Sequence, residues 1–155
     1  MATLTAVEVH NLTLSIARNA LIYPVDPVTI ARTATAIAFI ESTFNPDAKN
    51  KSSSASGLMQ ITKATQKDVE KLLKLRPDTQ RQKIFAPSYN ILLGMNRLAY
   101  QLRRYRGDYN KAIVAYNQGS YNTRAAGQAY LKHWASAYKK FNWPAIEAQV
   151  GYPNA

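Results

Sequence analysis

The strongest constraint in this sequence is an apolar segment that ends at one carboxylate and is followed closely by a proline. Asp26 and Pro27 are typical of a helix start, with Asp as the N-cap and Pro as the first helical residue. Isoleucine and alanine then recur at helical spacing, which places Glu41 on or beside a buried helix face. Pro46 disfavours helical geometry at Asn45 and helps to end the segment. These signals predict a buried helix that delivers Glu41 at its end.

Helical spacing also dominates the remaining chain, where prolines, glycines and polar stretches separate the segments. Residues 3–22 fit both a strand and a helix face, and a helix is favoured because no second strand pattern lies nearby. Residues 49–56 are a polar loop by composition. Further helices are predicted over 62–75, 88–102, 110–117 and 125–140, with a last short one beginning at Trp143-Pro144. The expected fold is mostly α-helical, a single domain over residues 1–155 with at most a small hairpin near residues 49–61.

Single residues add detail to the two middle helices. Ser88 is predicted to cap the helix over residues 88–102, and Pro77 to close the helix before it. Gly94 costs about 1 kcal/mol of helix propensity relative to alanine, which indicates that a neighbour packs closely against it.

Positive charge is concentrated in the later part of the chain. The net charge is +11, and residues 1–48 hold only two of the 20 basic residues against four of the nine acidic ones. Such a field attracts polyanions, and both nucleic acid and the anionic polymers of the bacterial envelope are candidates. The basic residues are dispersed over several helices, which argues against a nucleic-acid recognition surface. A solvated, solubilising surface is the third interpretation.

Several classes of protein are disfavoured by what the sequence lacks. Cysteine is absent and the two histidines, His10 and His133, lie far apart, so we expect no disulfide framework, no metal and no cofactor. The N-terminus lacks the basic and apolar regions of a secretory signal, and no apolar run is long enough to span a bilayer. We therefore expect a monomer made without a signal peptide, which reaches any extracytoplasmic target by another route.

Glu41 is the candidate catalytic residue. It lies near a helix C-terminus, where the helix dipole disfavours an anion, and the preceding Ile37 and Ala38 reduce its hydration; both effects raise the pKa of a carboxyl. A glutamic acid that stays protonated near neutral pH can donate a proton to a leaving oxygen. The alternative is a surface glutamate without a chemical role.

Glycoside hydrolysis commonly uses two carboxylates, yet no partner for Glu41 is evident. Asp26 and Asp108 are interpreted as helix caps, Asp68 and Glu70 as members of a lysine-rich helix, and Asp47 as an exposed residue. Sugar cleavage by this chain would therefore use one carboxylate, with the substrate supplying the nucleophile.

Four groups of motifs occur in a characteristic order. They are ESTFNPDA at 41–48 with ASGLMQI at 55–61, NILLG at 90–94 with GDY at 107–109, AYNQG at 115–119, and Tyr130-Leu131 followed by Tyr138 and Phe141. Together they resemble the soluble lytic transglycosylase (SLT) family of the lysozyme-like superfamily. The resemblance covers roughly residues 24–141, and the ordered set is far more specific than any one motif.

The resemblance implies cleavage of the β-1,4 bond between N-acetylmuramic acid and N-acetylglucosamine in the glycan strands of peptidoglycan. Glu41 would protonate the glycosidic oxygen and then take the proton of the muramoyl C6 hydroxyl, which closes on C1 to give a 1,6-anhydro product. The implied substrate-binding residues are Ser56, Gln60, Tyr116, Asn117 and Tyr130. Tyr130 would place its hydroxyl close to Glu41, whereas Leu58 and Met59 are interpreted as core.

The sequence departs from the family pattern at three points. The loop between Glu41 and Gly57 is slightly longer than is common, so the family's loop serine corresponds to one of three residues, Ser52, Ser53 or Ser54. Ala126 stands where many members carry an acidic residue. Lys63 stands where a proline is usual.

Alternative functions remain open at this stage. One is a muramidase on the same fold, with a water nucleophile positioned by another residue. Another is a basic nucleic-acid-binding domain. For the transglycosylase we expect action on the bacterial cell wall, as a phage endolysin, a virion-associated lysin or a secretion-associated enzyme, with the basic surface attracting anionic envelope polymers.

Overall fold

The computed structural model describes residues 2–150, which form seven α-helices. They are α1 (Ala6–Asn19), α2 (Pro27–Ser42), α3 (Lys63–Leu72), α4 (Pro87–Arg104), α5 (Tyr109–Gln118), α6 (Ala125–Lys140) and α7 (Trp143–Gln149). Within the described range, extended pairing is limited to isolated bridges of Ser56 with Lys49 and with Ile61. The prediction of a mostly α-helical fold is therefore confirmed. None of the described helices is long and apolar enough to cross a membrane.

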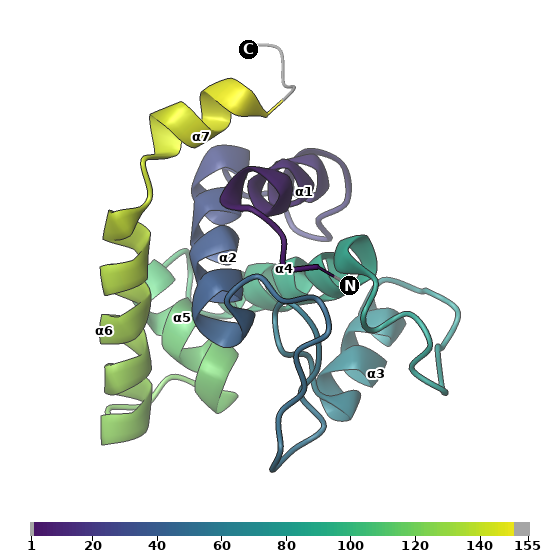
Figure 1. The fold of residues 1–155 in the computed structure, drawn as a ribbon. Helices are drawn as coiled ribbons and strands as arrows, with labels where there is room; N and C mark the ends of the chain where they lie inside the picture. Colours follow the sequence, from purple (N-terminus) through teal and green to yellow (C-terminus); the bar gives the residue numbers. More distant parts are fainter. Residues whose placement is uncertain (1, 151–155) are drawn as a thin grey trace.

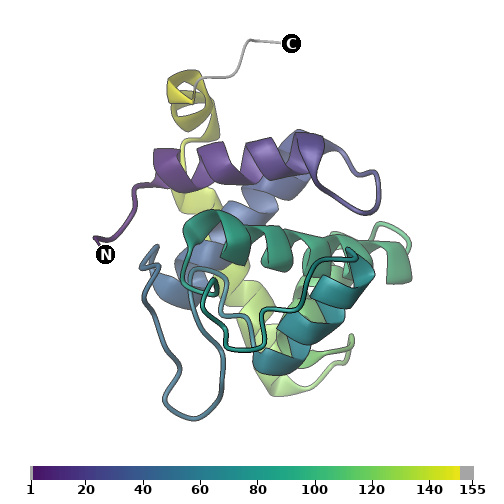
Figure 2. The same ribbon diagram turned by 90° about the vertical axis from the view of Figure 1, so that its right-hand side faces the viewer.

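Helix α4 is the central element of the fold. It contacts α1, α2, α3 and α5, and in Figure 2 it runs through the middle of the molecule beneath α1. Its side chains Ile91, Leu93, Met95 and Leu98 are fully buried. Helix α6 packs along α2 and α5, and α7 contacts α1 (Figure 1). The long segment between α2 and α3 is a loop, which extends downward next to α3 in the view of Figure 1.

Short-range signals set most helix starts. Asp26 caps α2 by accepting a hydrogen bond from the Thr29 amide at 3.0 Å, as predicted. The prediction for α4 was wrong in detail, because the N-cap is Ala86 and the helix begins at Pro87, not after Ser88. Proline suits the first helical position since its φ is already helical and its missing N–H has no acceptor there.

Helix α3 ends earlier than predicted. Its last residue is Leu72, and Lys74 adopts a left-handed conformation with φ of 57°. The chain therefore leaves the helix before Pro77 can act on it.

Gly94 allows a close contact between α4 and the loop that precedes α3. A Cβ atom at Gly94 would lie 2.4 Å from Sδ of Met59, so the prediction of a closely packed neighbour is confirmed. Gly57 lies on the same face of α4, where a Cβ atom would lie 2.2 Å from Nδ2 of Asn90. The segment of residues 57–60 thus rests directly on the α4 backbone.

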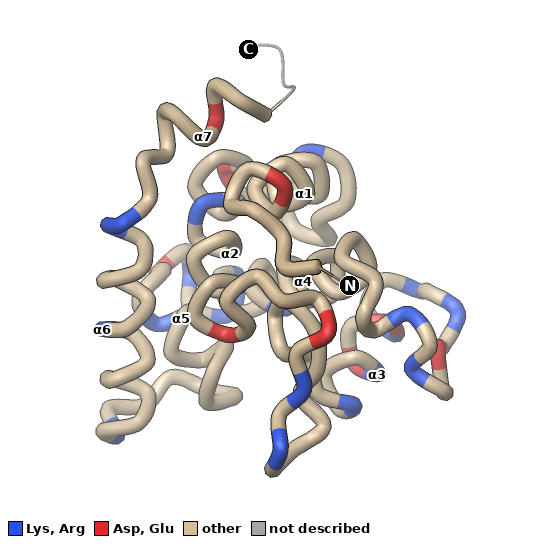
Figure 3. Tube along the Cα trace, viewed as in Figure 1, with Lys and Arg blue, Asp and Glu red and all other residues tan. Residues whose placement is uncertain are grey.

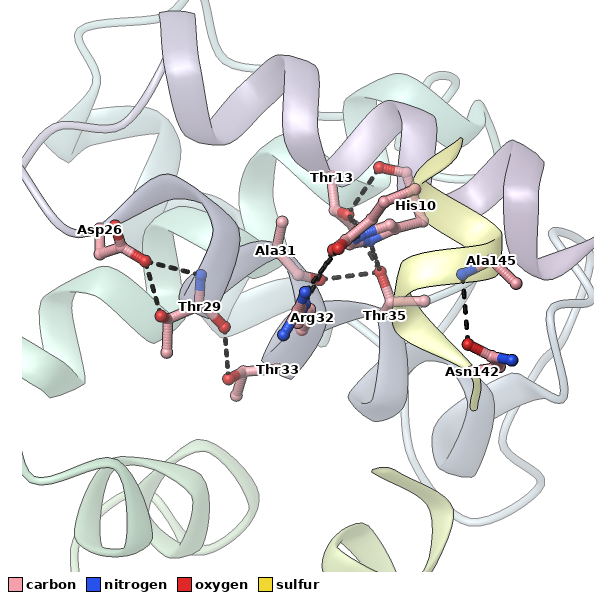
Figure 4. A network of polar contacts seen from close by, with 11 residues as sticks. His10, Thr13, Asp26, Thr29, Ala31, Arg32, Thr33, Thr35, Asn142 and Ala145 are labelled. Carbon is pink, nitrogen blue, oxygen red and sulfur yellow. Dashed lines mark hydrogen bonds and ion pairs between the residues drawn. The ribbon is translucent and has the colours of Figure 1, made fainter. Parts of the chain in front are cut away.

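A buried polar network ties α7 to α1 and α2 (Figure 4). His10 is fully buried, with Nε2 at 2.8 Å from Oε2 of Glu147 and Nδ1 at 3.0 Å from Oγ1 of Thr35. The same carboxylate accepts a hydrogen bond from Nε of Arg32 at 2.8 Å. Burial lowers the pKa of His10. We interpret this network as structural, because the His10 side chain is fully buried and the ion pairs of Glu147 join α7 to α1 and α2.

Candidate active site

A cleft of about 410 Å³ lies between the end of α2, the loop that follows it, α4 and the end of α5. Its lining consists of Glu41, Asn50, Ser53, Ala55, Gln60, Ile61, Thr62, Thr65, Arg97, Tyr116, Asn117, Gln118 and Gly119. The lining is mainly polar and includes hydroxyl, amide and guanidinium groups. Among these residues, all in the described part of the chain, Glu41 is the only acidic one.

The chain turns sharply just after Glu41. Thr43 and Phe44 both have positive φ, 49° and 63°, which is unfavourable for residues other than glycine. Burial of the Phe44 ring offsets this cost, since the ring packs against Phe39 and Phe141 with centroids 5.3 and 6.0 Å apart. Glu41 is therefore fixed at the last turn of a buried helix.

The environment of Glu41 favours its protonated form. Burial raises its pKa to about 7, and a hydrogen bond from the Tyr130 hydroxyl to Oε2, at 3.0 Å, acts in the opposite direction. The raised pKa expected from the sequence is thus confirmed, with burial as its cause. Close to pH 7, similar fractions of Glu41 are protonated and ionised, so this residue can both donate and accept a proton.

The segment of residues 57–60 supports the part of the cleft wall that Gln60 forms, and Asn90 holds the segment in place. Oδ1 of Asn90 accepts a hydrogen bond from the Met59 amide at 2.8 Å, and Nδ2 donates to the carbonyl oxygens of Ser56 and Ile84 at 2.9 and 2.8 Å. The Tyr116 hydroxyl donates to the Met59 carbonyl oxygen at 2.8 Å. Asn90 and Tyr116 therefore anchor this wall to α4 and α5.

The amide side chains of the cleft differ in how far they are engaged. Nε2 of Gln60 donates to the carbonyl oxygens of Ala48 and Gly57, at 3.1 and 2.9 Å. Gln60 itself has a positive φ of 52°, which is held by these bonds. Oδ1 of Asn117 accepts a hydrogen bond from Nε2 of Gln118 at 2.6 Å. The NH2 group of Asn117 makes no hydrogen bond within the described structure. Asn117 therefore has donors to offer a ligand.

The structure separates the candidate serines. Ser56 does not line the cleft, because it is buried and its hydroxyl donates to the Ser54 carbonyl oxygen at 2.9 Å. Ser53 does line the cleft, and its Oγ accepts from the Ala55 amide at 3.2 Å. Ser56 thus shapes the loop, while Ser53 is the loop serine that faces the cleft.

Glu70 is placed differently from its sequence-based interpretation. It is only 4% exposed, and its carboxylate is held by groups other than the lysines of α3. Its Oε2 accepts hydrogen bonds from Nε2 of Gln66 at 3.0 Å, from the Asp78 amide at 3.2 Å and from the Tyr89 hydroxyl. Glu70 therefore joins α3 to α4 and does not provide a second acid in the cleft.

Arg81 connects this cluster to the cleft loop. Its Nε donates to Oε1 of Gln66 at 2.8 Å, and its terminal nitrogens donate to the carbonyl oxygens of Ser54 and Ile61 at 2.7 and 2.5 Å. One guanidinium thus holds both arms of the loop that carries Gln60.

Sequence reasoning did not identify Arg97 as a cleft residue. A signal was present, because Arg97 follows Asn90 and Gly94 at helical spacing on α4, and both of those residues contact the cleft loop. A third residue on that helix face is expected to reach the same region.

The raised pKa of Glu41 predicts a measurable effect on stability. Its folded-state pKa of about 7 exceeds the ordinary value of 4.5, so folding favours the proton, and stability is lost as pH rises through 7. Glu41→Gln avoids this loss. The free energy of unfolding of the variant minus that of the unmodified protein is expected to be about 2 kcal/mol larger at pH 8 than at pH 4. This value allows for the partial exposure of Glu41 to solvent. Urea denaturation at both pH values measures it, and a difference independent of pH would contradict the expectation.

Comparisons with known proteins agree with this geometry. The Transglycosylase SLT domain profile matches residues 18–133. The peptidoglycan transglycosylase gp16 of Escherichia phage T7 is 39% identical over 83 residues, which are 54% of this chain and 6% of the phage protein. In the complex of the 70-kDa soluble lytic transglycosylase with bulgecin A, a similar fold covers 90% of this chain and 22% of that one, with a TM-score of 0.59 and 23% identity.

The chain therefore spans only a small part of either relative. The family profile nevertheless matches most of the chain, over the residues that form the cleft and its supports. The resemblance noted in the sequence is confirmed. This chain belongs to the transglycosylase SLT domain family.

Proposed function

We propose that the chain is a peptidoglycan lytic transglycosylase that cleaves the bond between N-acetylmuramic acid and N-acetylglucosamine and leaves a 1,6-anhydromuramoyl end. The observation that carries this proposal is that Glu41 is the single acidic residue among residues 2–150 that lines the cleft, and that it has a pKa of about 7. A second carboxylate would be needed to serve as nucleophile or base in the usual glycosidase mechanisms. The name of the T7 relative supports the same activity and substrate.

One carboxyl can perform both proton transfers of this reaction. The Glu41 carboxyl gives its proton to the glycosidic oxygen as the bond from that oxygen to C1 breaks. The resulting carboxylate takes the proton of the muramoyl C6 hydroxyl, whose oxygen bonds to C1. Glu41 ends protonated, as it began, and no water is consumed. A pKa near the working pH suits both steps.

The remaining predicted residues have distinct proposed roles. Gln60 and Asn117 supply amide groups for the hydroxyl and acetamido groups of the sugars, and the Tyr116 side chain supplies part of the cleft wall. Tyr130 holds one oxygen of Glu41, which leaves the other for the substrate. Ser56 contributes through the loop turn, and Ser53 is a further candidate contact.

Basic residues surround the loop side of the cleft. Figure 3 shows Lys and Arg along the segment between α2 and α3 and along the connection from α3 to α4. Lys49, Lys51 and Lys63 are exposed there. We propose that this surface attracts the anionic polymers of the envelope and that the chain acts on the bacterial cell wall as a phage-type lysin.

Product analysis tests the proposed chemistry. Purified sacculi digested by the protein are expected to yield muropeptides with 1,6-anhydro ends, which mass spectrometry detects as species lighter by one water than reducing-end products. Reducing ends would instead support the muramidase alternative, with water as the nucleophile. A digest that contains neither product would overturn the proposal.

Tyr130→Phe is expected to change the pH dependence of the reaction. The Tyr130 hydroxyl bonds the carboxylate of Glu41 and so lowers its pKa; without it, the pKa of Glu41 rises further. The alkaline limb of kcat/KM, where Glu41 loses its proton, should move to higher pH. Loss of the bond should also reduce the maximal rate by about threefold to tenfold. Tyr100→Phe is the control, because Tyr100 lies outside the cleft, and a limb that does not move in Tyr130→Phe would contradict the role assigned to Tyr130.

A further inference from the structure

Arg97 is a cationic side chain of the cleft that no neighbour neutralises. It extends from α4, is half-buried and lines the same cleft as Glu41. Within residues 2–150, no hydrogen bond or ion pair involves its guanidinium. Other arginines of α4 do have partners: Arg103 lies 4.5 Å above the Tyr23 ring, and Arg104 donates to the Gly119 carbonyl oxygen at 3.0 Å. The guanidinium of Arg97 therefore keeps its donors available for a ligand.

The charged residues near Arg97 determine whether its guanidinium is available to a ligand. Asp68 of α3 lines a second hollow together with Arg97, and no ion pair joins the two side chains in the described part of the chain. Arg97 and Tyr116 line the same cleft, and the positive charge of Arg97 partly opposes the rise that burial causes in the pKa of Tyr116. An arginine paired with Glu41 would hold the pKa of that carboxyl below its ordinary value, whereas burial raises it. Arg97 therefore lines the same cleft as Glu41, and no ion pair joins the two within residues 2–150.

We propose that Arg97 forms a carboxylate-binding subsite on the α4 wall of the cleft, which recognises an acidic group carried by the glycan strand. This inference rests on the proposed function, because peptidoglycan differs from neutral amino-sugar polymers in carrying such groups. A carboxylate is present on the peptide stem, and another is present on the lactyl group of muramic acid where the stem has been removed. A guanidinium binds either one through two parallel hydrogen bonds, which an ammonium cannot reproduce.

The test compares two variants on chemically matched strands. Arg97→Met keeps the aliphatic stem and removes the charge, and Arg97→Lys keeps the charge and removes the fork of donors. The substrates are strands with intact stems, strands freed of stems by an amidase, and both strands after conversion of their carboxyls to neutral amides. Arg103→Met is the matched control, because it removes the same charge from the same helix outside the cleft.

The expected result is a loss of affinity confined to acidic strands. Arg97→Met should raise KM about tenfold on at least one carboxylate-bearing strand. Arg97→Lys should raise KM on the same strand by a smaller factor, because it keeps the charge. It should have no effect on the amidated strands, and Arg103→Met should have no strand-specific effect. An effect on stem-bearing strands alone assigns the stem carboxylate, and an effect on stem-free strands assigns the lactyl carboxylate.

Two results would overturn the inference. One is an unchanged KM in Arg97→Met on every acidic strand, and the other is an equal loss on acidic and amidated strands, which indicates a structural role. Failure of the proposed function looks different, since the unmodified protein would then release no product with a 1,6-anhydro end from any strand.

Discussion

Glu41→Gln is expected to reduce the release of muropeptides by about a thousandfold or more, because the variant lacks the proton that the leaving oxygen must receive. Glutamine has nearly the same shape and can still accept the hydrogen bond from Tyr130, so the cleft should keep its geometry. Both proton transfers are assigned to this one carboxyl, and no other acidic residue in the described part of the chain lines the cleft to replace it. The loss should therefore appear in kcat, with KM little changed.

The control for this variant must separate chemistry from folding. Asp68→Asn neutralises an exposed carboxylate on α3 and is expected to retain the activity of the unmodified protein. Glu41→Gln should meanwhile unfold at a higher urea concentration than the unmodified protein at pH 8, since it lacks a buried charge. A stable but inactive variant is the expected combination. Activity near that of the unmodified protein would remove Glu41 from the mechanism.

The placement of Glu41 was predictable because its determinants are local. The Asp26-Pro27 start, the apolar period and the stop at Pro46 act within one segment, and the structure reproduces that helix as Pro27–Ser42. The packing at Gly94 was predictable for a related reason, because a glycine inside a helix carries a cost that some contact must offset. The contact itself, with Met59, comes from a distant part of the chain.

Features that depend on several distant contacts were not predictable. Glu70 has lysines beside it in the sequence, and only the folded chain brings Gln66, Tyr89 and the Asp78 amide to its carboxylate. The choice between Ser53 and Ser56 depends on loop hydrogen bonds that no spacing rule specifies. The start of α4 was predicted wrongly because Pro87 and Ser88 are adjacent and each favours a different start: Pro87 as the first helical residue, and Ser88 as the N-cap.

Asn90→Ala is expected to lower the free energy of unfolding by about 3 kcal/mol or more, because it removes three hydrogen bonds to buried backbone groups. These groups are the Met59 amide and the carbonyl oxygens of Ser56 and Ile84, and Asn90 itself is fully buried. Two of them belong to the loop that carries Gln60, which forms part of the cleft wall. Urea denaturation measures the loss of stability, and kinetics below the unfolding transition measure the loss of activity.

Asn96→Ala provides a closely matched control on the same helix. Asn96 is also fully buried and also makes three hydrogen bonds, to the Ile22 amide and to the carbonyl oxygens of Ala20 and Leu92. Its partners lie in α4 itself and in the connection between α1 and α2, away from the cleft lining. Both variants should therefore be destabilised to a similar degree.

The two variants should differ in activity. In Asn90→Ala the segment of residues 57–60 loses a fixed position against α4, so Gln60, which we propose contacts the sugars, is no longer held in a single orientation. Misplacement of a binding group lowers kcat/KM even when the proton donor is intact, and about a tenfold to hundredfold loss is expected. Asn96→Ala, assayed where it is folded, should retain nearly full activity. Equal losses in the two variants would show that stability alone, and not the position of the cleft wall, accounts for the effect of Asn90.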